Sequence, residues 1–263
     1  MAFTNDLDST VPILCDAMGS MRSVPEYRPL PNDMFWEGAV NARWITGAFY
    51  RMGRHEWLTD LGWQQMRGDG IARVIDLRNP GEIKRREHDP VLDHEGVEGV
   101  QVLELPLETS DNERFASVAV PYMNHTNMYR LVCEEFGDQL RAVFEALSET
   151  AEHGTVIHCS AGRDRSGLIA TLLLDLAGRR EDIVAHDELA VRGINEWHRV
   201  SPRKHPYESY QNEPELRRNI AERAQGLQEF LQWLGSARDF LSSCGMQSED
   251  LDQLQNLVRQ PKP

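Results

Sequence analysis

The sequence lacks the features that mark zinc domains, disulfide frameworks and membrane spans. Its four cysteines are widely spaced and none belongs to a CxxC pair, so neither structural zinc nor a set of disulfides is expected. No apolar run approaches the length of a bilayer-crossing helix. A secretory signal has a basic segment followed by a continuous apolar core, and the first twenty residues have neither. We therefore expect a cytoplasmic protein with reduced thiols and no stable membrane insertion.

Lysine is also scarce, and acidic residues outnumber basic ones by 42 to 28. The formal net charge is −14, and of the 28 basic residues only Lys84, Lys204 and Lys262 are lysine. A field of that sign repels polyphosphates at long range, which argues against nucleic acid as a partner and against broad adhesion to anionic membranes. Any anionic substrate must then be held by a local positive site.

Apolar patterns predict strands that alternate with helices. The β-branched run "IARVIDL" is typical of a buried strand, and so are "GVQVLELPL" and "TVIHC". "GAFYRMG" predicts a further short strand and turn. Helices are predicted at residues 56–70, 122–147, 165–176, 180–190, 216–234 and 248–258.

Strands separated by helices predict an α/β fold with a mostly parallel central sheet flanked by helices. The sequence contains no internal repeat, so one domain over residues 1–263 is expected. Residues 1–38, which contain several prolines, are expected to form an extended arm over this domain. Residues 206–263 are expected to form a helical C-terminal section packed on the same domain.

The stretch "TVIHCSAGRDRSGLIATLLL" places a short charged loop between a predicted strand and a predicted helix. Cys159 ends the strand, at the edge of the sheet where α/β proteins place their ligand sites. The small residues Ser160, Ala161 and Gly162 let backbone amides converge on one point, and Gly162 can adopt a positive φ. Arg165 opens the helix, whose first amides and dipole favour an anion in the same hollow.

Such a hollow has two chemical consequences. It binds a phosphate dianion, which the planar guanidinium of Arg165 grips through two oxygens, and it favours the ionised thiolate of Cys159. A thiolate beside a bound phosphate is placed for in-line attack on phosphorus, and the surrounding donors stabilise the charge of the transition state. Ser166 can donate to the sulfur and help it leave in a second step.

The reaction also needs an acid for the leaving group and a base for the incoming water. Asp164 is the nearest carboxylate, although the adjacent Arg163 and Arg165 would tend to lower its pKa. Asp111 is the alternative if the polar segment "ETSDNER" folds over the site, and Asp76, at the end of its own strand, is a third. The residues alone leave the choice among these three open.

The segment "HCSAGRDRSG" resembles the HCxxGxxR[ST]G signature of cysteine-dependent phosphatases, and is most similar to the loop of the atypical bacterial tyrosine and lipid phosphatases. "GAFYRMG", "IARVIDLRNPGE" and the tail from Phe230 to Val258 resemble further segments of that family. The resemblance covers the chain from about Ala39 onward. It implies hydrolysis of phosphomonoesters through a cysteinyl-phosphate intermediate, without metal or other cofactor, and release of inorganic phosphate.

Carried over by position, the resemblance makes Cys159 the nucleophile, Arg165 the phosphate clamp and Asp164 the acid within the loop. Asp76 and Arg78 match the segment that borders the family's phosphate pocket. The predicted phosphate-binding set is therefore Ser160, Ala161, Gly162, Arg163, Asp76 and Arg78, with Ser166 beside the sulfur.

Two positions depart from the family pattern. Arg163 stands where relatives have lysine, and a basic residue there is associated with phosphoinositide as well as phosphotyrosine activity. The chain's general use of arginine in place of lysine is the simpler explanation. In addition, "NARWITG" stands where relatives often carry "NFRDLGG", which leaves the outer wall of the pocket undefined.

Other polar residues near the loop have structural explanations. His158 is expected to orient the backbone around the sulfur. Glu82, three residues after Asn79, fits a capping box. The basic residues between Arg192 and His205 either receive a second phosphate or balance local acids.

The leading interpretation is a phosphatase acting on phosphotyrosine proteins, with dual or lipid specificity left open. One alternative is a phosphoinositide phosphatase. Another is a non-catalytic phosphate-recognition module, but binding alone needs no nucleophile, so the joint presence of Cys159, Asp164 and Arg165 counts against it.

Overall fold

The computed structural model describes residues 27–93, 97–109, 111–119, 123–149, 153–201 and 208–262. Five strands within these residues form one sheet in the order β1-β2-β5-β3-β4. Their bounds are β1 (Arg43–Thr46), β2 (Phe49–Met52), β3 (Ile71–Asp76), β4 (Gln101–Glu104) and β5 (Gly154–His158). All neighbouring pairs are parallel except β1 and β2, which are antiparallel. The predicted, mostly parallel sheet is confirmed, and the "NARWITG" segment supplies its antiparallel edge strand.

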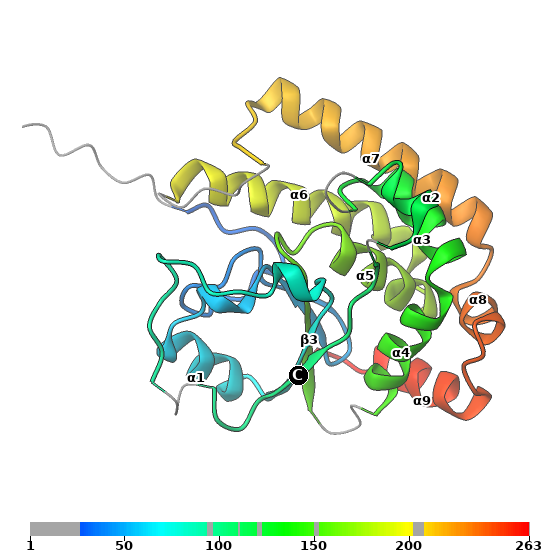
Figure 1. Ribbon diagram of the computed structural model, residues 1–263, viewed down its shortest axis with the longest axis horizontal. Coiled ribbons are helices and arrows are strands. Elements are labelled where there is room, and N and C mark those ends of the chain that lie inside the picture. Colours follow the sequence, from blue (N-terminus) through cyan, green and yellow to red (C-terminus); the bar gives the residue numbers. More distant parts are fainter. Residues whose placement is uncertain are drawn as a thin grey trace, which may run out of the picture.

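Helices cover both faces of this sheet (Figure 1). α1 lies on one face, and α4, α5 and α9 lie on the other, with α3, α6, α7 and α8 packed around them. The helices are α1 (Asp60–Gly68), α2 (Glu113–Ala116), α3 (Tyr129–Glu135), α4 (Gly137–Ser148), α5 (Arg165–Leu176), α6 (Ile183–Val200), α7 (Glu213–Leu234), α8 (Ala237–Ser243) and α9 (Ser248–Val258). Short 3₁₀ helices are η1 (His55–Trp57), η2 (Pro80–Glu82), η4 (Thr126–Met128) and η5 (Arg180–Asp182).

Adjacent residues of the central strands pack against the helices on opposite faces of the sheet, because successive side chains of a strand point to opposite faces. Val74 of β3 and Val156 of β5 belong to the cluster that contains Trp63 of α1. Their neighbours Ile75 and Ile157 belong to the larger cluster that contains α5 and the C-terminal helices. Both faces are therefore apolar, which explains why these strands read as continuous hydrophobic runs.

The central helix α5 is buried on nearly every side, as its sequence predicts: of its twelve residues only Asp175 is not buried. A helix held this firmly fixes the position of its own first residue. That residue is Arg165, so the packing of α5 places the arginine of the charged loop at the edge of the sheet.

The helical prediction for residues 122–147 is correct in type but wrong in continuity. Phe136, with φ −126° and ψ 38°, interrupts the helix, so that α3 ends at Glu135 and α4 begins at Gly137. A Cβ at Gly137 would lie 3.3 Å from the sulfur of Cys244. The turn therefore lets the start of α4 pack closely against the segment that follows α8.

The two ends of the chain compare differently with the sequence. The C-terminal section is helical as predicted, with α8 as an additional helix between α7 and α9. Of the expected arm, residues 1–26 lie outside the described residues, while Asp33 forms an isolated bridge with Arg43 of β1.

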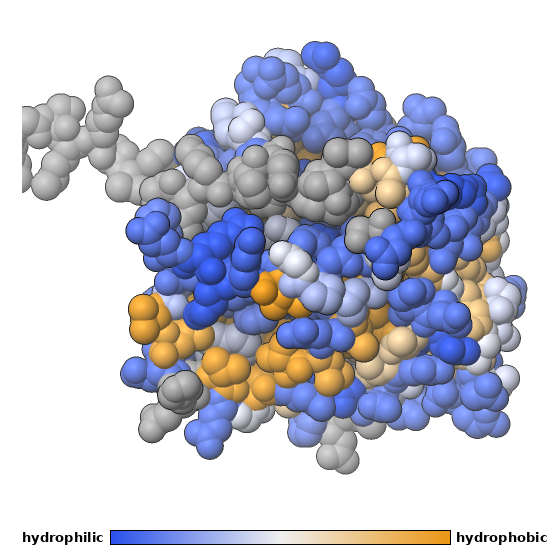
Figure 2. Space-filling model, viewed as in Figure 1, coloured by the Kyte–Doolittle hydropathy of each residue, from blue (hydrophilic) through white to orange (hydrophobic). Residues whose placement is uncertain are grey.

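Hydrophilic side chains cover the outer surface of α7 (Figure 2). Among the helices described, none is long and apolar enough to cross a bilayer.

Candidate active site

The parallel strands bring three strand ends to one edge of the sheet. Met52 of β2 and Asp76 of β3 are both in register with His158, the last residue of β5. Cys159 follows immediately and is buried, with its sulfur 3.6 Å from the hydroxyl of Ser166. The structure thus brings the predicted nucleophile and its predicted donor together at the carboxyl edge of the sheet.

Every backbone carbonyl of the loop from Cys159 to Asp164 accepts a hydrogen bond from a group outside the loop. The pairs are Cys159 O with His158 Nδ1 (3.2 Å), Ser160 O with Arg54 N (3.0 Å), Ala161 O and Gly162 O with Asn41 Nδ2 (3.2 and 3.0 Å), Arg163 O with Arg51 Nη2, and Asp164 O with Tyr129 Oη (3.1 Å). The N–H of each peptide plane points opposite to its carbonyl. The amides of residues 160–165 therefore point away from these anchors, an orientation that an anion-binding nest requires.

Two residues meet the conformational demands of this loop. Gly162 has φ +67°, as predicted, and a Cβ there would lie 2.4 Å from the backbone carbon of Met52. Asn41 also has a positive φ, of 56°, which asparagine tolerates better than most residues. Its amide donates to two loop carbonyls, and its Oδ1 accepts from Arg43 (2.8 Å).

The predicted phosphate clamp, Arg165, is buried and held by Glu82. Its Nη1 and Nη2 donate to the two carboxylate oxygens at 2.5 and 2.8 Å. Burial would lower the pKa of Arg165, but these hydrogen bonds and a second carboxylate outweigh it, so the pKa is raised. Glu82 also accepts from the backbone N of Asn79 at 3.2 Å, as in the predicted capping box. Sequence reasoning recognised the cap and missed the ion pair that orients the clamp.

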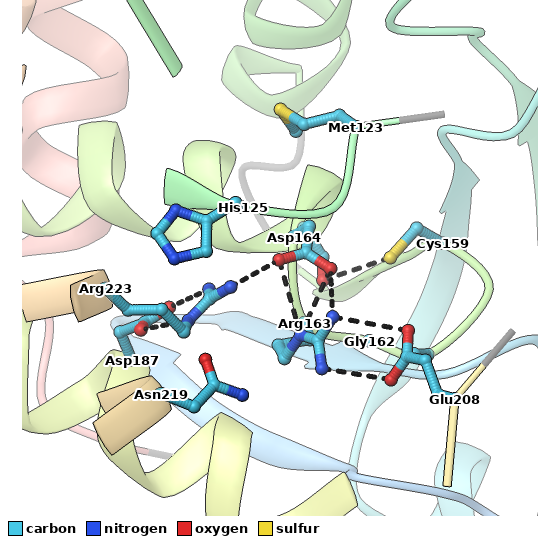
Figure 3. A network of polar contacts seen from close by, with 12 residues as sticks. Met123, His125, Cys159, Gly162, Arg163, Asp164, Asp187, Glu208, Asn219 and Arg223 are labelled. Atoms are coloured by element: carbon cyan, nitrogen blue, oxygen red, sulfur yellow. Dashed lines mark hydrogen bonds and ion pairs between the residues drawn. The ribbon is translucent and has the colours of Figure 1, made fainter. Parts of the chain in front are cut away.

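Asp164 lies at the centre of a buried ion network (Figure 3). Arg223 of α7 donates to Asp164 (2.7 Å) and to both carboxylate oxygens of Asp187 on α6 (2.9 and 2.7 Å). Arg163 donates to Asp164 and, at 3.0 and 3.3 Å, to Glu208. Burial alone would raise the pKa of Asp164, but the two arginines outweigh it and hold that pKa well below its usual range.

Basic residues proposed for a second phosphate have carboxylate partners in this structure. Arg163 is held between Asp164 and Glu208. Arg192 pairs with Glu188 and Arg199 with Glu196 in partly buried positions along α6. The remaining members of that basic segment, Arg203, Lys204 and His205, lie outside the described residues.

Asp76 and Arg78 form a buried ion pair with a closest distance of 2.6 Å, and Arg78 also donates to Glu56 at 2.9 Å. Burial would raise the pKa of Asp76, but its neighbours, including Arg78, lower it to about 2. A carboxylate held in this way is poorly suited to act as an acid. That either residue contacts phosphate stays a prediction.

His158 has the structural surroundings that its sequence position suggests. Its Nε2 is 2.9 Å from His55 Nδ1, and its Nδ1 is 3.2 Å from the carbonyl of Cys159. Burial lowers its pKa to about 3, so the ring is neutral. His55, Asp76 and His158 offer three ligand atoms within 4.8 Å of one another. The imidazoles already bond each other and the carboxylate is paired with Arg78, so this group is a poor fit for a metal ion.

Glu108, which sequence reasoning did not single out, is the second carboxylate at Arg165. It follows β4, is fully buried, and lies 3.7 Å from Nη1 of Arg165. Burial raises its pKa to about 6. Asp111, the predicted alternative acid, is three residues further along the chain and is exposed, so the structure does not bring it into the loop.

Fold and site together define an anchored loop built around a cysteine, set between a parallel strand and a buried helix. The sequence model described as the tyrosine phosphatase family matches residues 38–260, and the chain belongs to this family.

The chain is similar to two curated bacterial proteins over part of their lengths. It is 27% identical over 147 residues to the tyrosine-protein phosphatase of Nostoc commune, a match that covers 53% of this chain and 47% of that protein. It is 29% identical over 172 residues to the triple specificity protein phosphatase PtpB of Mycobacterium tuberculosis, covering 54% and 60%. The matches thus span about half of these relatives. The crystal structure of Tk-PTP in the active form aligns with 73% of this chain and 99% of its own at 14% identity, with a TM-score of 0.35.

Replacing Arg223 tests the ion network. Arg223→Ala should lower the free energy of unfolding by about 3–5 kcal/mol at neutral pH, because it removes the cation paired with buried Asp187 and one of the two cations paired with buried Asp164. The depressed pKa of Asp164 means that this stabilisation is present at neutral pH and is lost as the pH falls. The deficit should therefore shrink below about pH 4, where aspartates begin to be protonated. Urea unfolding at several pH values measures it.

The matched control for this experiment is Arg217→Ala, on the same helix, whose side chain is 73% exposed and pairs with Glu213. We expect little change in the free energy of unfolding from it. Equal effects of the two substitutions, or a deficit from Arg223→Ala that does not change with pH, would contradict the role of the network.

Proposed function

We propose that the protein is a phosphomonoester hydrolase that acts on phosphotyrosine proteins through a cysteinyl-phosphate intermediate. The observation that carries this proposal is the loop itself, in which the carbonyls are anchored outward around Cys159 and Arg165 stands at its end. Membership of the tyrosine phosphatase family and the names of the two bacterial relatives support it.

In the first step the Cys159 thiolate attacks phosphorus. A P–S bond forms, the P–O bond to the leaving group breaks, and the leaving oxygen takes a proton. Arg165 and the loop amides neutralise the charge on the three remaining phosphate oxygens. The main contribution of the protein to this step is to hold the phosphate and the thiolate in the right relative position, and the anchored loop can supply that.

In the second step water attacks the phosphocysteine, the P–S bond breaks, and inorganic phosphate is released. Ser166, 3.6 Å from the sulfur, is placed to donate to the departing thiolate. Asp164 is ionised, and it is our candidate to accept the proton of the attacking water.

Asp164 is also our first candidate for the acid of the first step. Arg163 and Arg223 oppose its protonation in the empty site, whereas a bound phosphate dianion offsets these cations. Asp111 remains the alternative if its segment closes over the loop when substrate binds.

Substitution of the nucleophile is the primary test. Cys159→Ser should abolish hydrolysis of p-nitrophenyl phosphate, measured without added metal, because a hydroxyl in this loop is a far weaker nucleophile than a thiolate. Cys244→Ser, at a partly buried cysteine remote in sequence from the loop, should keep full activity. Retained turnover in Cys159→Ser would refute the assignment. A wild-type protein that binds phosphate without turnover would instead indicate a recognition module.

A series of aryl phosphates with progressively poorer leaving groups identifies the acid. Asp164→Asn should slow the poorest leaving groups by about a hundredfold or more and flatten the basic limb of the pH profile, since these groups depend most on proton donation. Asp111→Asn should behave as wild type. The reverse order of effects would make Asp111 the acid and imply a closing segment.

Phosphotyrosine peptide should be hydrolysed with a higher kcat/KM than a soluble phosphoinositide. A second phosphate needs a cation of its own, and Arg163 already donates to Asp164 and Glu208. The name of the mycobacterial relative is a reason to include phosphoserine peptide in the panel. If the phosphoinositide is preferred and Arg163→Ala removes that preference, the lipid alternative is correct.

A further inference from the structure

Two carboxylates with very different surroundings share the guanidinium of Arg165. Glu82 binds it through two hydrogen bonds, and its side chain is 26% exposed. Glu108 lies 3.7 Å from the same guanidinium and has no exposed surface. One of these acids can exchange contacts with water, and the other cannot.

The carboxylate of Glu108 is incompletely satisfied. Its Oε1 accepts from the backbone N of Met123 at 3.3 Å. Its Oε2 is buried and has no hydrogen-bond partner among the described residues. A buried carboxylate oxygen without a donor favours the protonated acid, because the neutral form loses less hydration on burial.

The charged groups around Glu108 act in opposite directions. Burial is the largest influence and raises its pKa to about 6, with Glu82 and Asp164 adding to the rise. Arg165 and the amide of Met123 oppose it. The same Arg165 outweighs the burial of Glu82 and lowers that residue's pKa. Of the two acids at the clamp, only Glu108 is poised to change its charge near neutral pH.

A bound dianion changes this balance. It lies against Arg165, competes for the attraction that keeps Glu108 ionised, and adds negative charge nearby. Binding of the dianion therefore favours protonation of Glu108, and by linkage protonation of Glu108 favours binding to the same extent.

Resting on the proposed function, we propose that Glu108 takes up a proton from solvent when a phosphate-like dianion binds at Arg165, so that the complex holds a neutral buried carboxyl group beside the anion. The Oε2 atom, which has no donor among the described residues, becomes an O–H. The pocket thereby removes a like charge at the moment the substrate arrives. Above neutral pH this proton is harder to obtain, and affinity for the dianion falls.

Isothermal titration calorimetry of sulfate binding tests this directly. Sulfate remains a dianion over the whole range, and the full chain with Cys159→Ser removes any titration of the thiol. Titrations in two buffers of different ionisation enthalpy should show uptake of up to about one proton per sulfate near pH 7. Affinity should fall with rising pH, by up to about tenfold per pH unit above about pH 6.

Two further substitutions, each added to Cys159→Ser, assign the proton. Glu108→Gln keeps the shape without the charge, so sulfate binding should take up no proton and should not depend on pH. Glu82→Gln is the matched control at the same arginine, and proton uptake should persist there even if affinity drops. Unchanged uptake in Glu108→Gln would place the proton elsewhere, for example on His125, which lies near Arg223 and Asp164 (Figure 3), and would overturn the proposal.

Infrared difference spectra provide a readout that does not depend on the Glu108 variant folding. Sulfate binding to the Cys159→Ser protein should produce a protonated-carboxyl band, and its absence would refute the proposal. The outcomes are separable from those for the proposed function. Turnover by the wild type without proton uptake on sulfate binding would reject only this inference. Proton uptake on sulfate binding without turnover by the wild type would reject only the hydrolase. Failure to bind sulfate would count against both.

Discussion

The outward anchoring of the carbonyls from Cys159 to Asp164 is the constraint on which the site depends. A loop of small residues has many conformations, and only those with the amides on one side bind an oxyanion. The anchors come from elements far apart in the sequence, including Asn41 before β1, Arg51 on β2 and Tyr129 on α3. Each hydrogen bond contributes only about 0.5–1.5 kcal/mol net, but an unmade one would leave a buried carbonyl unsatisfied. The sheet and its helices are thus the support that selects one loop conformation.

Local pairing of charges allows an acidic chain to bury several arginines around one loop. Four buried arginines near the loop have carboxylate partners: Arg165 has Glu82 and Glu108, Arg78 has Asp76 and Glu56, and Arg163 and Arg223 share Asp164. Pairing reduces the penalty of burying each guanidinium, and it fixes the direction in which the guanidinium points. The negative net charge and the proposed phosphate site are therefore compatible, since the carboxylates that make the chain acidic also orient its arginines.

The predictable parts of the site are those that depend on residues close together in the sequence. The strand ending at His158, the positive φ of Gly162 and the buried helix after Arg165 all follow from residues within one short stretch. The partners of that stretch were missed because they arrive through tertiary packing. Arg223 left a faint signal, since it falls on the apolar stripe of α7 with Leu216 and Leu227, where a lone arginine requires a buried anion. Glu108 left none, because its surroundings come from Arg165 and the segment around Met123 rather than from its own strand.

The contrast between Glu82 and Glu108 shows how position divides two tasks between residues of one type. Both side chains lie beside Arg165. The direct hydrogen bonds from Arg165 outweigh the effect of burial on the pKa of Glu82 and keep it ionised. Glu108 is fully buried and 3.7 Å from Arg165, so the effect of burial prevails and its pKa is raised. Glu82 therefore governs where the guanidinium points, and Glu108 governs how much negative charge accompanies it. Because these two properties rest on different side chains, the geometry of the clamp and the charge of the pocket can vary independently. Without Glu108 the clamp would keep the two hydrogen bonds to Glu82 that orient it, but it would lose the buried carboxylate whose charge we propose to change.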